Sequence, residues 1–150
     1  MKKSKPKFEQ PLGRILSRLG KEFLSTMHAK LKGLDIKRSF YPLILIENGK
    51  GNITQQELAD QMNMDKVSIV RIVDYLSAIG YVKRVINPND RRKYSLVLTD
   101  KADKEMGRIK KSLSETKNIA LTGLNDVRIR EFYNTLEVIK RNFSESKTAL

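Results

Sequence analysis

Residues 54–80 read TQQELADQMNMDKVSIVRIVDYLSAIG, and residues 81–99 continue YVKRVINPNDRRKYSLVLT. The first stretch has helical spacing interrupted by a turn at Asn63 and Met64, and the second has two runs of β-branched and aromatic residues around a polar turn. This order predicts a helix, a turn, a second helix and a strand–turn–strand hairpin, which is the layout of a winged helix-turn-helix. In that layout the second helix enters a DNA major groove, and the hairpin reaches the neighbouring minor groove.

Each helix of this pair begins at a residue that favours helix N-termini. Thr54 is followed three residues later by Glu57, which is the spacing of a capping box. Asp65 is placed to cap the second helix, and Gly80 is placed to end it in a left-handed conformation. The residues expected to face the core recur at helical spacing: Leu58, Ala59 and Met62 in the first helix, and Ile69, Ile72, Val73 and Leu76 in the second.

Longer helices are predicted on both sides of residues 35–99, the expected DNA-binding unit. Residues 11–34 and 100–145 have apolar stripes that must be buried against something, and a two-fold dimer is the commonest solution. Residues 1–10 are basic and polar, and we interpret them as a flexible arm, either a solvated tail or a contact to backbone phosphates. The predicted class is mainly α with a small β-hairpin wing. The candidate dimer-interface residues are Leu12, Leu16, Leu19, Ile129, Phe132, Leu136, Ile139 and Phe143.

The composition favours a polyanionic partner. Lys and Arg number 30 against 17 Asp and Glu, a formal net charge of +13, as expected for a chain that binds nucleic acid. Cysteine is absent and His28 is the only histidine, so we expect no metal site, no cofactor and no catalytic constellation. The longest apolar run is far shorter than the roughly 20 residues of a membrane span, and the N-terminus does not resemble a secretory signal. We therefore expect a cytoplasmic protein that is not an enzyme.

Candidate DNA contacts lie on the outward face of the second helix and at the hairpin turn. The helix face carries Lys66, Val67, Ser68, Val70, Arg71, Asp74 and Tyr75. An arginine at the hairpin tip is long enough to enter a minor groove, and Asp90 is placed to hold its fork by a bidentate pair. The alternatives are a solvated helix face and a charged, soluble turn. The complete candidate set is Thr54, Gln55, Lys66, Ser68, Val70, Arg71, Arg84, Asp90, Arg91, Arg92 and Lys93.

At these residues the chain resembles the MarR family of bacterial transcription regulators. Asp90-x-Arg92, five further residues and Leu98-Thr99 fit the family's D-x-R-x-x-x-x-x-L-T wing signature, behind a matching helix pair. The resemblance implies a homodimer on a pseudo-palindromic operator, with Arg92 in a minor groove, and repression or activation relieved by a small, often aromatic or phenolic, ligand. Val70 departs from the family, which usually has a polar residue there, often threonine. Operator contacts at that position should therefore be apolar.

Three residues are candidates for an effector pocket: His28, Phe40 and Tyr41. For His28 the alternative is an exposed or interface residue, and for Phe40 and Tyr41 it is core packing. Three functions remain open on the sequence. They are a ligand-responsive repressor, a DNA-binding regulator without an effector, and a winged-helix module for protein contacts.

Overall fold

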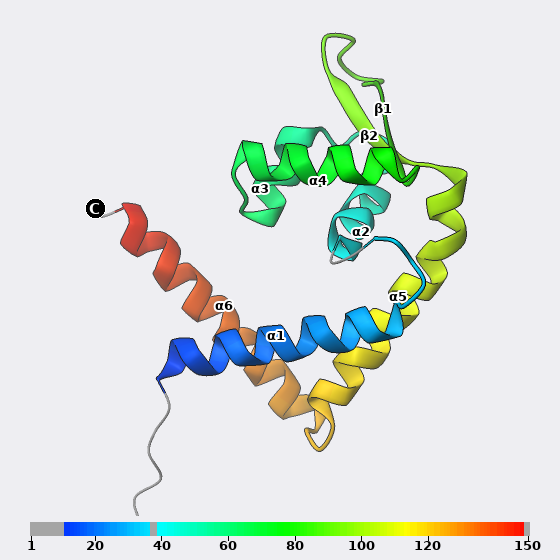
Figure 1. The fold of residues 1–150 in the computed structure, drawn as a ribbon. Coiled ribbons are helices and arrows are strands. Elements are labelled where there is room, and N and C mark those ends of the chain that lie inside the picture. Colours follow the sequence, from blue (N-terminus) through cyan, green and yellow to red (C-terminus); the bar gives the residue numbers. More distant parts are fainter. Residues whose placement is uncertain (1–10, 37–38, 149–150) are drawn as a thin grey trace, which may run out of the picture. The chain divides into compact units, whose positions relative to one another are not determined.

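The computed structural model describes residues 11–36 and 39–148, and within them the chain forms six helices and one antiparallel hairpin (Figure 1). The predicted mainly α class with a small wing is therefore confirmed. The predicted arm at residues 1–10 lies outside the described residues. The elements are α1 (Leu12–Lys30), α2 (Phe40–Asn48), α3 (Gln55–Met62), α4 (Lys66–Ala78), β1 (Val82–Ile86), β2 (Tyr94–Leu98), α5 (Asp100–Leu121) and α6 (Asp126–Thr148).

The chain divides after Thr116 into two compact units. The first unit contains α1 to α4, the hairpin and most of α5, and the second contains the end of α5 and α6. All the predicted DNA-reading residues belong to the first unit.

The helix boundaries in the DNA-reading region follow the capping residues of the sequence. The Thr54 hydroxyl accepts the Glu57 amide at 3.2 Å, and the Thr54 amide donates to the Glu57 carboxylate at 2.7 Å, which completes the predicted capping box. Asp65 Oδ1 accepts the Ser68 amide at 2.8 Å and starts α4. Asn63 ends α3 with a φ of 50°, so the short connection that leads through Met64 to the cap Asp65 begins with one left-handed residue.

One hydrophobic core joins the elements of the first unit. Leu58 from α3, Ile69, Val73 and Leu76 from α4, and Leu96 from β2 are each at most 1% exposed. The same cluster includes residues of the flanking helices, namely Met27, Leu43, Ile46, Met106 and Ile109. Helix α4 is therefore held in this core by Ile69, Val73 and Leu76 of its inner face.

Charged side chains also secure α1 to α5 within this unit. The Arg108 guanidinium donates to the carbonyls of Lys30 and Lys32 at 3.2 and 2.7 Å, which satisfies acceptors at the C-terminal end of α1. Lys30 Nζ lies 2.8 Å from Glu115 Oε2, and this contact holds the pKa of the Glu115 carboxyl below its usual range.

Apolar side chains remain exposed on α1 and α6. Leu12 and Leu19 of α1 are 58% and 60% exposed, and Phe143 of α6 is 61% exposed. Leu16 is 38% and Phe132 44% exposed, whereas Ile129, Leu136 and Ile139 are half-buried. These are the positions that the sequence assigned to a dimer interface. None of the described helices combines the length and apolarity that crossing a membrane would require.

Candidate nucleic-acid interface

The outer face of α4 presents two cations and one apolar side chain. Lys66 and Arg71 are exposed, and Val67, which lies one turn before Arg71, is 61% exposed. Val70 is half-buried and is therefore less available than Val67 for contact with a base. Helical spacing in the sequence places Val67 on this face, but Val67 is not among the predicted contacts. Its i, i+4 spacing to Arg71 was the signal that could have found it.

Two other residues of the predicted outward face have internal roles. The Ser68 hydroxyl donates to Asp65 Oδ2 at 2.6 Å, so Ser68 belongs to the N-terminal cap of α4. The Tyr75 hydroxyl donates to the backbone carbonyl of Asp35 at 2.6 Å, so the prediction that Tyr75 points outward with the DNA-reading face was wrong. Desolvation and the hydrogen bond to Asp35 raise the pKa of Tyr75. Tyr75 thus ties α4 to the segment between α1 and α2.

Arg84 of β1 links the wing to both α3 and α4. Its Nη2 donates to Gln55 Oε1 of α3 at 2.9 Å and to Asp74 Oδ1 of α4 at 2.8 Å. The Arg84 side chain is 37% exposed and that of Asp74 is 59% exposed. Two candidate DNA contacts, Arg84 and Gln55, are therefore engaged with each other in the free protein.

The wing pairs β1 with β2 from Val82 opposite Leu98 to Ile86 opposite Tyr94. The amide of Leu96 donates to the carbonyl of Ile53 at 2.8 Å, which attaches the hairpin to the segment preceding α3. An open cleft of about 550 Å³ lies between α3 and the hairpin, with Thr54, Glu57, Arg84, Lys93 and Tyr94 among its lining residues. The wing and the helix pair therefore form one continuous surface.

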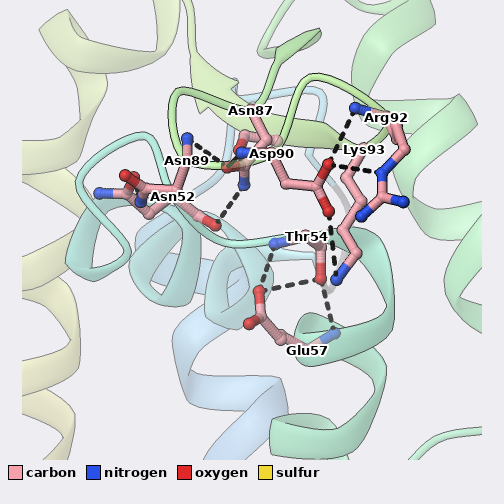
Figure 2. Close-up of polar contacts among 9 residues, drawn as sticks. Asn52, Thr54, Glu57, Asn87, Asn89, Asp90, Arg92 and Lys93 are labelled. Carbon is pink, nitrogen blue, oxygen red and sulfur yellow. Dashed lines mark hydrogen bonds and ion pairs between the residues drawn. The ribbon is translucent and has the colours of Figure 1, made fainter.

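The wing tip holds Arg92 outward (Figure 2). Asp90 Oδ1 accepts the Arg92 amide at 3.1 Å and Arg92 Nε at 3.2 Å, while the Arg92 side chain stays 91% exposed. These hydrogen bonds lower the pKa of the Asp90 carboxyl, and Lys93 Nζ lies 3.9 Å from Oδ2. The prediction that Asp90 forms a bidentate pair with the guanidinium was wrong, because a single oxygen, Asp90 Oδ1, accepts both the backbone amide and Nε of Arg92. Asp90 therefore holds Arg92 at its backbone amide and Nε, while the rest of the side chain stays exposed.

A second cleft, of about 800 Å³, lies within the first unit beside α1 and α2. His28 and Tyr41 line it together with Leu24, Ser25, Ser39, Pro42, Met62 and Ile72. Phe40 is 6% exposed and packs in the core, which is the alternative that the sequence left open for it, and it is not among the residues that line this cleft. Neighbouring helix positions face different directions, and Tyr41 rather than Phe40 faces the cleft. Among the described residues, no group of three or more His, Asp or Glu side chains is placed to hold a metal ion.

Comparisons with known proteins agree with this geometry. The sequence model of the MarR family matches residues 43–94, which include α3, α4 and most of the wing. The HTH-type transcriptional regulator BilQ of Clostridioides difficile (strain CD3) is 27% identical over 131 residues, covering 87% of this chain and 88% of BilQ. The chain belongs to the MarR family.

Solved structures extend the likeness of this MarR-family protein over most of its length. A MarR transcriptional regulator from Methanosarcina mazei Go1 superimposes with a TM-score of 0.74 at 27% identity, over 89% of this chain and 96% of that one. CouR from Rhodococcus jostii RHA1, solved with bound p-coumaroyl-CoA, gives a TM-score of 0.78 at 26% identity, over 90% and 95% of the two chains. The shared fold therefore includes the flanking helices as well as the reading unit.

Proposed function

We propose that this MarR-family transcriptional regulator binds a pseudo-palindromic DNA operator as a homodimer. In each protomer α4 lies in a major groove and Arg92 in the adjacent minor groove. The observation that carries the proposal is the pairing of an exposed cationic face on α4, formed by Lys66 and Arg71, with an arginine that is 91% exposed at the wing tip. Cations at such positions neutralise phosphates, and side chains in the grooves discriminate bases.

Exposed apolar side chains of α1 and α6 support the dimer. A chain that leaves Leu12, Leu19 and Phe143 about 60% exposed gains free energy by burying them against a second copy. A dimer also explains a pseudo-palindromic site, because two-fold protein symmetry presents two α4 helices to two half-sites.

Control by a small aromatic ligand is the finer part of the proposal. It is supported by the 800 Å³ cleft that His28 and Tyr41 line, since this volume lies in the range of small-molecule sites. It is also supported by CouR, a structural neighbour solved with a phenolic acyl-CoA. Because the cleft adjoins α2 and Ile72 of α4, a ligand there contacts the reading unit directly. We infer that the ligand releases DNA and that the protein is a repressor.

The test begins with selection of duplexes from a random pool, followed by fluorescence anisotropy on the selected site. Between 50 and 200 mM salt, affinity should fall about 10³- to 10⁵-fold if a dimer makes roughly 6–10 phosphate contacts. Arg92→Ala should weaken binding, whereas Lys104→Ala, which removes one exposed charge from α5, should not. Recovery of no preferred sequence, or a flat salt response, would contradict DNA recognition.

The effector is tested separately on the same complex. Phenolic acids and their thioesters are titrated into the protein–DNA complex, using the wild type and His28→Leu. If a compound displaces DNA from the wild type but not from His28→Leu, the result supports a ligand-responsive repressor. Displacement that is unchanged by cleft substitutions, or absent with every compound, favours a regulator controlled by its own abundance.

A further inference from the structure

The root of the wing contains a buried asparagine that the DNA-contact assignment does not use. Asn87 follows β1 directly and is 6% exposed. Its Nδ2 donates to Ser95 Oγ at 2.8 Å and to the backbone carbonyl of Asn52 at 3.3 Å. Its Oδ1 accepts the amides of Asn89 and Asp90 at 2.8 and 3.0 Å. The side-chain amide thus uses both of its donors and both acceptor positions.

These bonds connect Asn87 to the groove-reading arginine through two short steps (Figure 2). Asn87 Oδ1 fixes the backbone of Asp90, and Asp90 Oδ1 then holds both the amide and Nε of Arg92. The backbone amide of Asn87 also donates to the backbone carbonyl of Lys93 at 2.9 Å, which closes the base of the turn. The direction in which Arg92 leaves the wing is therefore set by the orientation of the Asn87 side chain.

On its other side, Asn87 is anchored to the helix pair. Asn52 lies in the connection between α2 and α3, two residues before the cap Thr54, and its Oδ1 also accepts Asn89 Nδ2 at 3.0 Å. This connection is constrained, because Lys50 and Gly51 have φ values of 47° and 81°. A Cβ on Gly49 would approach Ile53 Cβ to 2.6 Å. The anchor therefore has little freedom to move with the wing.

We propose that Asn87 is a positioning residue for minor-groove recognition. It fixes the wing tip relative to the helix pair, so that Arg92 reaches one defined position beside the half-site read by α4. The inference depends on the proposed DNA binding, and it assigns the spacing between major-groove and minor-groove contacts to a group that touches no DNA. Without Asn87, Arg92 keeps its charge and exposure but loses its fixed origin.

A double-mutant cycle tests this inference. Affinities are measured for wild type, Asn87→Ala, Arg92→Ala and the double variant on duplexes with A·T-rich or G·C-rich flanks. Asn87→Ala should weaken binding to the A·T-rich duplex about fivefold to tenfold, the effect of losing roughly one net hydrogen bond. It should also reduce the preference for A·T-rich flanks, where a narrow minor groove attracts arginine. In the Arg92→Ala background, the same substitution should change affinity less than twofold.

Two further variants separate positioning from folding. Asn87→Asp keeps an acceptor for the two turn amides but replaces the donor to Asn52 and Ser95 with a carboxylate oxygen. In the folded variant, the preference for A·T-rich flanks should therefore exceed that of Asn87→Ala. Asn89→Ala removes one exposed hydrogen bond from the turn to Asn52 Oδ1 but leaves every Asn87 bond in place, so it is the control for the loss of a turn hydrogen bond that does not hold Asp90 or Arg92. Thermal melting followed by circular dichroism establishes that each variant is folded.

The outcomes distinguish the two levels of the proposal. Equal losses from Asn87→Ala with and without Arg92 would overturn positioning through Arg92, as would normal flank preference in a folded Asn87→Ala protein. If Arg92→Ala itself leaves DNA affinity unchanged, the proposed minor-groove contact fails and the inference fails with it.

Discussion

Replacing Arg84 by methionine should lower the thermal stability of the protein, and it should leave the number of phosphate contacts to DNA unchanged. The substitution keeps an apolar stem of similar length and removes the guanidinium that donates to Gln55 at 2.9 Å and Asp74 at 2.8 Å. These two contacts join β1 to α3 and α4. The variant therefore tests whether Arg84 is a structural link or a phosphate contact.

The expected magnitude follows from exposure. Asp74 is 59% and Arg84 37% exposed, so their ion pair contributes about 0.5 kcal/mol, in the range of solvent-exposed pairs. The hydrogen bond to Gln55 contributes about 0.5–1 kcal/mol more. A total near 1–1.5 kcal/mol corresponds to a fall in thermal midpoint of roughly 2–6 °C for a protein of this size.

The assay is thermal unfolding followed by circular dichroism at one fixed protomer concentration, because dimerisation makes the midpoint depend on concentration. Asp74→Ala and the double variant complete a cycle, and the coupling between Arg84 and Asp74 should be about 0.5 kcal/mol. Salt titrations of DNA binding are run beside it. An unchanged midpoint, combined with a salt slope smaller by about one, would refute the structural role and place Arg84 on a phosphate.

Three other predictions address the cap, the dimer and the reading face. Hydrogen bonds from the Thr54 amide and hydroxyl lower the pKa of Glu57 below 4.5, so its stabilisation is complete above that pH and is lost as pH falls through the folded-state pKa. Glu57→Gln should accordingly melt lower than wild type at pH 7, and the difference should shrink as the pH falls below 4.5; a constant difference would contradict the linkage. Leu19→Asp, at a side chain that is 60% exposed in the single chain, should yield folded monomers of 17.3 kDa by light scattering, and persistent dimers would exclude Leu19 from the interface. Val67→Thr should change the selected base at one position per half-site, whereas Val70→Thr should change it less; the reverse result in binding-site selection would mean that α4 reads DNA with its other edge.

Local sequence rules were sufficient for the boundaries of the DNA-reading helices. Thr54 with Glu57, and Asp65 at the start of α4, make hydrogen bonds within three residues of the chain, so spacing alone identifies them. The wing was similarly predictable, because β-branched runs on either side of a polar turn have few alternative structures. These features depend on neighbours in sequence, and the prediction succeeded for that reason.

Contacts between distant segments were not predictable in the same way. Tyr75 donates to Asp35 across 40 positions, and Arg84 donates to Gln55 across 29. Helical spacing places each residue on a face but does not reveal which remote acceptor lies opposite. Asn87 lies in the polar turn that the sequence predicts, and nothing in its neighbours shows that its side chain is buried between the hairpin and Asn52. Long-range partners therefore decided which polar residues are engaged internally and which remain available to DNA.

That division also explains how acidic side chains can occupy a surface proposed to face phosphates. Asp65, Asp74 and Asp90 all lie on α4, its cap or the wing tip, where an unpaired carboxylate would repel DNA. Each instead accepts from this chain: Asp65 from the start of α4, Asp74 from Arg84, and Asp90 from Arg92. The carboxylates thus act as local orienting groups, while Lys66, Arg71 and the outer end of Arg92 carry the exposed positive charge. Replacing one of these acids by its amide would raise the net charge but weaken the charged acceptor that orients its donor, so a gain in overall positive charge need not give a gain in specific affinity.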